Sequence, residues 1–252
     1  MKLRSLIDVY KNQDIYIVGA GPSVNVFPME FLKDKICLSL NDTYKMHPAV
    51  KPIVIMNNVA YAHAGSRDAP FHENFKHIKY PVVKMTGRYS SWKGVDWDDP
   101  YYYCYDWSHK IDTDIWTLTK DTDYLYSTPD GCILQDAMQL CWILGARNVF
   151  IIGCDSRTMG GKHYADFDKD GFSADEAPKG FYKKERNYDS YVYGTLIARE
   201  FLRRKGINVF NLSGIVGYHL VDRQFDVLKG SSPLESVLED VRKLPKWDVA
   251  QT

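Results

Sequence analysis

The sequence lacks several features that would place it in a class at once. It has five cysteines, an odd number, and no Cys-x-x-Cys pair, which argues against a disulfide framework or a zinc site. No apolar run approaches the ~20 residues of a membrane-spanning helix, and no signal peptide is visible, so we expect a cytoplasmic protein without a membrane span. Lys plus Arg and Asp plus Glu are both 32, which argues against a protein that grips nucleic acid by bulk charge.

Motifs of several enzyme classes are also missing. The chain contains neither a Gly-x-Ser-x-Gly elbow nor a P-loop sequence, which argues against a hydrolase triad of that type and a P-loop kinase. The seven histidines are scattered, without HxH or HExxH spacing, so we predict no metal site. The five cysteines are expected to be reduced, and several lie in apolar runs that predict burial.

Short apolar runs that end in small or polar residues predict strands buried on both faces of a parallel sheet. They span 14–18, 35–40, 52–56, 82–85, 148–152 and 207–212. Helical patterns predict helices over 3–12, from near 23 to 33 with an interruption at Pro28, from about 131 to 144, over 188–205 and over 234–242. This alternation predicts an α/β fold, Rossmann-like and doubly wound, with a mostly parallel sheet.

Two stretches interrupt this pattern. Residues 87–126 are rich in Tyr and Trp without helical periodicity, which indicates an insertion of loops and short strands; its aromatic rings could form a small accessory core or line an acceptor cleft. Residues 157–187 are polar and rich in Gly and Lys, as expected for a lid. We therefore predict one catalytic domain over 1–228 and a tail with a short helix over 229–252.

Small residues follow the first predicted strand. Gly19 and Gly21 permit a tight turn and the close approach of a ligand, Pro22 fits a first helical turn, and Ser23 can bond amides there. Exposed amides and a helix dipole favour phosphate, although Val24 stands where the dinucleotide fingerprint has its third glycine. The turn is therefore a predicted phosphate site, with a purely structural turn as the alternative.

Other strand ends also carry polar residues. Asn41 and Asp42 follow the second strand at about the spacing of a ribose-binding acid, and Asn57 and Asn58 follow the third. All four could bind a nucleotide or form turns. Gly153 and Asp155 end the apolar strand 148–152, where the carboxylate could face a ligand or cap the next loop.

Three segments together resemble a known family. They are Ile17 to Ser23, the helix from Gly131 that leads to Ile151 to Asp155, and Lys162 to Ala165. The chain resembles the bacterial sialyltransferases of glycosyltransferase family 42 and the related MptE-like proteins, which include pterin pyrophosphokinases and flagellin glycosyltransferases of the Maf type. The resemblance covers roughly residues 14–215 and implies a GT-A-like variant of the Rossmann fold that binds a CMP- or UDP-linked sugar under a lid.

The resemblance also implies roles for residues. It assigns nucleotide contacts to Gly19, Gly21, Pro22, Ser23, Asn41, to Asn57 or Asn58, to Thr128 and Gly131, and to the lid residue Tyr164. Arg157 stands where the family has a tyrosine and could offer its charge to a leaving phosphate. The family's catalytic histidine is missing, because the matching position is Ser190; Asp189, His163 and Asp155 are the candidate bases.

The resemblance leaves three functions open. The first is a glycosyltransferase that needs no cofactor and moves a sugar to a hydroxyl of a glycan, lipid, protein or modified nucleic-acid base. The second is a pyrophosphokinase that uses ATP and Mg²⁺, with Asp112 to Asp114 and Asp121 to Asp123 as acidic metal ligands. The third is a non-catalytic nucleotide-binding protein. Family members are often oligomeric, so a homo-oligomer is expected.

Overall fold

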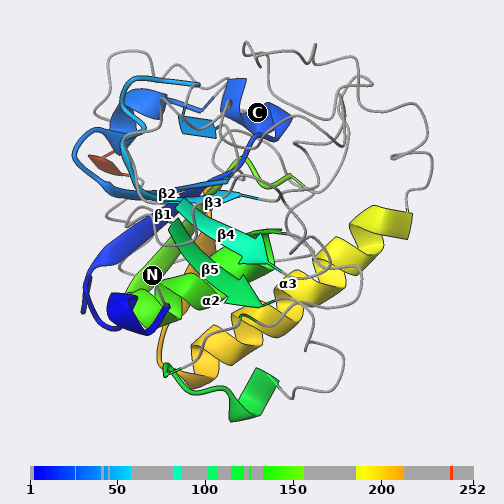
Figure 1. The fold of residues 1–252 in the computed structure, drawn as a ribbon. Coiled ribbons are helices and arrows are strands. Elements are labelled where there is room, and N and C mark those ends of the chain that lie inside the picture. Colours follow the sequence, from blue (N-terminus) through cyan, green and yellow to red (C-terminus); the bar gives the residue numbers. More distant parts are fainter. Residues whose placement is uncertain are drawn as a thin grey trace, which may run out of the picture.

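A parallel sheet forms the centre of the protein (Figure 1). The computed structural model describes residues 3–25, 27–40, 43–44, 46–57, 82–86, 102–106, 115–121, 125, 133–155, 186–212 and 239–240. Within them, seven strands lie in the order β5 (Tyr102–Asp106), β4 (Val82–Thr86), β3 (Pro52–Asn57), β2 (Ile36–Leu40), β1 (Asp14–Val18), β6 (Asn148–Ile152) and β7 (Asn208–Asn211). Every neighbouring pair is parallel, which confirms the predicted Rossmann-like α/β fold.

The central strands bury side chains on both faces of the sheet. Ile15 and Ile17 of β1 join one hydrophobic core, whereas Tyr16 and Val18, which alternate with them, join a second core on the opposite face. All five residues of β6 are buried. Continuous apolar runs are therefore the sequence signature of these strands, as expected for a parallel sheet covered on both sides.

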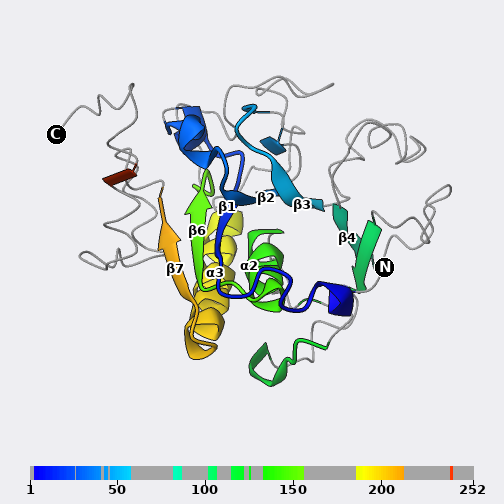
Figure 2. The same ribbon diagram turned by 90° about the vertical axis from the view of Figure 1, so that its left-hand side faces the viewer.

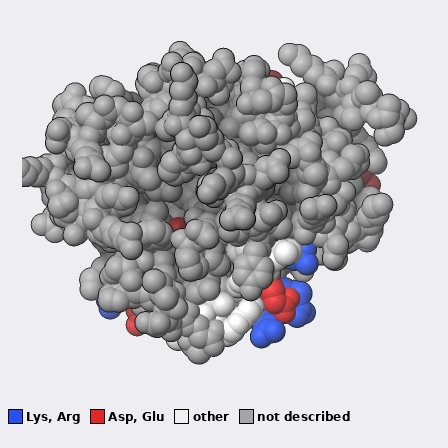
Figure 3. All heavy atoms as spheres, turned by 90° about the vertical axis from the view of Figure 1, so that its right-hand side faces the viewer, with Lys and Arg blue, Asp and Glu red and all other residues white. Residues whose placement is uncertain are grey.

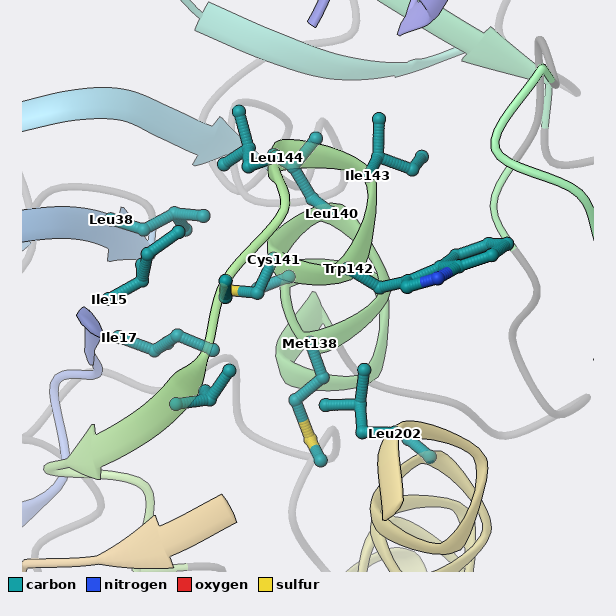
Figure 4. Packing of buried hydrophobic residues seen from close by; sticks show 14 of the residues in the cluster. Ile15, Ile17, Leu38, Met138, Leu140, Cys141, Trp142, Ile143, Leu144 and Leu202 are labelled. Atoms are coloured by element: carbon teal, nitrogen blue, oxygen red, sulfur yellow. The ribbon is translucent and has the colours of Figure 1, made fainter. Parts of the chain in front are cut away.

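Helices α2 (Ile133–Leu144) and α3 (Arg186–Arg204) lie on one face of the sheet (Figure 2). They contact each other, and α2 also contacts β1, β2 and β3. Figure 4 shows side chains of α2, β1 and α3 meeting in this core, with Cys141 near Ile17 and Met138 near Leu202. From Leu134 to Leu144 every residue of α2 is buried, so this helix is an internal element that supports the sheet.

On the other face, the predicted helix over residues 23–33 is replaced by two short 3₁₀ turns. These are η2 (Pro22–Asn25) and η3 (Met29–Leu32). Pro28 lies between them, and its missing amide and fixed φ prevent a continuous α-helix. The expectation of one interrupted helix was therefore wrong in its geometry, although the apolar side chains of η3 still pack into the second core.

The N-terminal segment also differs from the expected helix over 3–12. Only η1 (Leu3–Leu6) is helical, and Asp8 and Asn12 have φ values of 57° and 60°, which end an α-helix. The amides of Asp8 and Asn12 donate to the carbonyls of Ile143 and Gly145 at 2.8 Å each. The segment thus satisfies carbonyls that the C-terminal end of α2 leaves open.

The remaining expectations have three different outcomes. The strands over 14–18, 35–40, 52–56, 82–85, 148–152 and 207–212 and the helix over 188–205 are confirmed to within two residues. The aromatic-rich stretch supplies β5 and a 3₁₀ turn, η6 (Ile115–Thr117), so it extends the central sheet. The expected helix over 234–242 is described only at 239–240, where the backbone is helical.

Charged side chains lie in groups of mixed sign. At the lower edge of the face in Figure 3, blue Lys and Arg side chains surround red carboxylates. Glu200 on α3 forms such a group, because it accepts hydrogen bonds from Arg203 at 2.6 and 2.7 Å and from Arg204 at 3.0 Å. These bonds, first of all those of Arg203, hold the pKa of the Glu200 carboxyl at about 2.

Within the described residues, no helix has both the length and the apolarity to cross a membrane.

Two buried thiols are expected to resist alkylation. Cys37 and Cys141 are buried, and burial raises the pKa of the Cys37 thiol to about 12 and that of Cys141 as well. At pH 8 the folded protein should therefore contain almost no thiolate at either site. Because these folded-state pKa values are raised, the stability that the neutral thiols contribute is complete below pH 9 and is lost as the pH rises toward 12.

Peptide mapping after a timed iodoacetamide pulse at pH 8 measures this difference. The half-buried Cys154 is the internal comparison, and it should be labelled faster than Cys37 and Cys141. Equal labelling rates for Cys37 and Cys154 in the folded protein would contradict the described burial.

Candidate functional site

The carboxyl ends of β1 and β6 form the topological switch point of the sheet. From β1 the chain builds β2, β3, β4 and β5 on one side, and it then returns to build β6 and β7 on the other side. Connections that leave neighbouring strands in opposite directions open a crevice between them, and ligands of open α/β sheets bind there. In this protein, that position is where the loops that follow Val18 and Ile152 meet.

Three glycines bring these two loops into direct contact. The amide of Gly19 donates to the carbonyl of Ile152 at 2.7 Å, and the amide of Gly21 donates to the carbonyl of Gly153 at 2.6 Å. A Cβ on Gly19 would lie 2.6 Å from Cys154 Sγ, and a Cβ on Gly21 would lie 2.5 Å from Asp155 Oδ2. Side chains are therefore excluded at both positions by the neighbouring loop itself.

Asp155 binds the glycine turn through both of its carboxylate oxygens. The Ser23 amide donates to Oδ2 at 2.7 Å, and the Ser23 hydroxyl donates to Oδ1 at 2.6 Å. Both residues are buried, with 0% of Ser23 and 5% of Asp155 exposed. Short bonds to an ionised acceptor are among the stronger hydrogen bonds in proteins, so this pair holds the turn against the end of β6.

Three amides of the Gly19–Ser23 turn therefore have partners inside the protein. Gly19, Gly21 and Ser23 donate to the β6 loop, and Val24 donates to the Gly21 carbonyl at 3.1 Å. The expected helix dipole is also missing, because η2 contains only four residues in 3₁₀ geometry. The helix-dipole reason for phosphate at this turn was therefore wrong. Among the described residues, Asp155 acts as a cap on the glycine turn.

A second buried pair fixes the end of β2 beside β1. The hydroxyls of Ser39 and Thr43 are 2.5 Å apart, and the Thr43 hydroxyl donates to the Val18 carbonyl at 2.8 Å. Both side chains are fully buried. The chain on either side of residues 41–42 is thus tied to the last residue of β1, at the edge of the sheet where the glycine turn begins.

The structure brings together only part of the predicted site. Gly19, Gly21, Ser23, Gly153 and Asp155 meet at the switch point. Asn57 is the last residue of β3, at the same edge of the sheet, whereas Asp189 lies near the start of α3. Residues outside the described part of the chain are Asn41, Asn58, Thr128, Gly131, Arg157, His163 and Tyr164. No cluster of three or more His, Cys, Asp or Glu side chains that could hold a metal ion occurs among the described residues.

One polar group was missed by the sequence reasoning. Gln135, Asp136 and Gln139 of α2 are each 1% exposed, and Thr195 of α3 is fully buried. A Cβ on Gly194 would lie 2.6 Å from the Gln135 side-chain carbon, so this glycine lets α3 approach α2. The sequence contains a signal for this group, because polar residues that interrupt an otherwise apolar helix indicate a buried polar contact.

Removing the Ser23 hydroxyl tests the contact with Asp155. Ser23→Ala should lower the free energy of unfolding by about 1–3 kcal/mol, because it deletes a buried hydrogen bond to a carboxylate. Urea unfolding measures the change, and a Ser23→Ala/Asp155→Asn double-mutant cycle should show a coupling energy. Additive effects of the two substitutions would contradict the contact. Ser5→Ala, at an exposed serine, is the matched control with little expected effect.

Comparison with known proteins gives one likeness. The sequence matches no protein-family model and no curated protein. Among solved structures, the chain is similar to the sialyltransferase CstII from Campylobacter jejuni in complex with a substrate analogue, cytidine-5′-monophosphate. The two are 16% identical, the match covers 80% of each chain, and the TM-score is 0.45.

Proposed function

We propose that this chain is a glycosyltransferase that binds a CMP- or UDP-linked sugar donor at the carboxyl edge of β1 and β6. The observation that carries the proposal is the switch point, where two glycine-lined loops meet at the position at which open α/β sheets bind nucleotides. The resemblance of the same loops to the sialyltransferase motifs supports sugar transfer as the reaction.

In this proposal, each part of the site has a distinct task. Gly19, Gly21 and Gly153 shape the wall of the crevice, and Ser23 and Asp155 hold that wall rigid. Asp189 or His163 removes the proton from the acceptor hydroxyl, and Arg157 stabilises the charge that develops on the departing nucleotide phosphate. The segment 157–187 covers the donor sugar and excludes water, which would otherwise compete with the acceptor. No metal ion takes part.

A thermal-shift panel with CMP, UDP, GDP, ADP, ATP and NAD, each with and without Mg²⁺, tests the binding part of the proposal. A nucleotide at 100 times its dissociation constant stabilises a protein by about 2.7 kcal/mol, which is readily measured. A metal-independent shift with CMP or UDP is the expected result. A shift with ATP that requires Mg²⁺ would favour a pyrophosphokinase, and no shift with any nucleotide would contradict the proposal.

Separate substitutions identify the catalytic base once a donor is known. Asp189→Asn or His163→Gln should abolish most turnover while leaving donor binding intact, because each removes a proton acceptor without a large change in shape. Asp34→Asn, at an exposed aspartate with no proposed role in the site, is the matched control, and its turnover should stay normal. Normal turnover in both Asp189→Asn and His163→Gln would exclude both residues as the base.

A further inference from the structure

We propose that Asp155 is a positioning residue that fills the anion position of the Gly19–Ser23 turn, so that a bound nucleotide places its nucleoside, and not its phosphates, against this turn. The inference rests on the proposed function for the presence of a nucleotide. The occupation of the turn by an internal carboxylate is a separate statement and can be tested without any nucleotide.

The amides of Gly19, Gly21 and Ser23 point away from a ligand and toward the β6 loop. Phosphate sites on glycine turns depend on backbone amides that point toward the ligand. Here the amides of Gly19, Gly21 and Ser23 point toward the β6 loop and end on the Ile152 carbonyl, the Gly153 carbonyl and Asp155 Oδ2. A phosphate that used these donors would have to displace a strand-end carbonyl or the Asp155 carboxylate.

The space between the glycine turn and the β6 loop is too small for a phosphate. A methyl group on Gly19 or Gly21 would already lie within 2.6 Å of atoms of the β6 loop. A phosphate is much larger than a methyl group, so it cannot enter between the two loops without separating them. Separation would break the Ser23–Asp155 hydrogen bonds of 2.6 and 2.7 Å in a region where Asp155 is only 5% exposed.

The charge of Asp155 also disfavours a phosphate at the turn. Asp155 places a negative group at the turn, and a second anion beside it is repelled, more strongly in a buried site than in water. A nucleoside is neutral and experiences no such repulsion. The lowest-energy orientation of a nucleotide in this crevice therefore has its nucleoside near Asp155 and its phosphates further along the carboxyl edge.

The first experiment uses inorganic phosphate as the probe and amide NMR of ¹⁵N-labelled full-length protein as the readout. In the wild type, phosphate should leave the Gly19, Gly21 and Ser23 amides unchanged, because their acceptors are internal. In Asp155→Ala, which removes both the charge and the volume of the carboxylate, the Ser23 amide should shift with added phosphate. A phosphate-dependent shift of the Ser23 amide in the wild type would overturn the inference, whether or not Asp155→Ala folds.

The second experiment compares cytidine with CMP, or uridine with UDP, by calorimetry. Asp155→Asn should increase the preference for the nucleotide over its nucleoside by about tenfold, the effect of removing one unit charge about 12 Å away at an effective dielectric constant near 20. Asp34→Asn removes an exposed carboxylate just before β2, at the amino edge of the sheet, and should leave this ratio nearly unchanged, which separates the effect of Asp155 from a change in net charge. An unchanged ratio in Asp155→Asn would overturn the proposed orientation, and so would an increase of about a hundredfold or more, which phosphates directly beside Asp155 would give.

The two experiments separate failure of this inference from failure of the proposed function. If no nucleotide or nucleoside binds the wild type, the proposed function fails, and the proposed orientation fails with it. The phosphate experiment still decides whether Asp155 fills the anion position, because it requires no nucleotide. If nucleotides bind and the wild-type Ser23 amide shifts with phosphate, the function stands and the role of Asp155 is overturned.

Discussion

Replacing Gly153 with alanine is expected to lower the free energy of unfolding by about 2–5 kcal/mol. Two effects add at this position. Gly153 has a φ of 68°, a left-handed conformation that costs a residue with a Cβ about 1–2 kcal/mol. The new Cβ would also press against the Val24 side chain and the Gly19 backbone, so the two loops of the switch point would have to move apart.

Gly206 offers a matched control for this substitution. Its φ is 79°, close to that of Gly153, but a Cβ there would meet no atom within 4 Å. Gly206→Ala should therefore show the conformational cost alone, about 1–2 kcal/mol. Urea denaturation of both variants measures the difference. Equal losses for the two substitutions would show that the loops at the switch point are not in close contact.

Much of the fold could be predicted because its signals are local. The runs Ile15 to Val18 and Val149 to Ile152 are continuously apolar, and a small residue follows each. Strands with these features are parallel and buried on both faces. The ends of α2 and α3 were also visible, since Gly145 and Gly206 follow them and both adopt positive φ.

The differences arose where a partner distant in sequence decides the local structure. Residues 8–12 turn away from a helix because their amides bond the last carbonyls of α2, more than 130 residues later. Strand β5 lies in a stretch whose aromatic residues show no alternation. It is a strand because it pairs with β4, and the sequence pattern does not show this pairing. Helix propensity is a weak preference that tertiary contacts readily override.

In the candidate site too, the local features were predictable and the contact between distant residues was not. The glycine turn and the carboxylate after β6 were both predicted at strand ends, from local composition alone. Their contact was not predictable, because the sequence does not show that Asp155 reaches Ser23, 132 positions away. That contact changes the chemistry of the site, since it replaces a set of exposed amides by an internal ion–amide bond.

The other large effect is expected in the second core, on the face of the sheet opposite α2 and α3. Phe150→Ala should lower the free energy of unfolding by about 3–5 kcal/mol, the usual range for a buried phenylalanine. Phe150 is fully buried and lies in register between Tyr16 and Phe210. Its ring stacks on both, with centroid distances of 4.9 and 5.2 Å and interplanar angles of 16° and 21°.

The size of this effect follows from the position of the ring within three adjacent strands. Removing the ring leaves a cavity, and Tyr16 and Phe210 lose the ring on which both stack. Strand β6, whose carboxyl end lies at the switch point, then packs less tightly against β1 and β7. Trp116→Ala is the control, because Trp116 is 38% exposed and its truncation should cost much less. Thermal and urea unfolding compare the two variants. A loss for Phe150→Ala no larger than that for Trp116→Ala would mean that the three rings do not form a continuous stack.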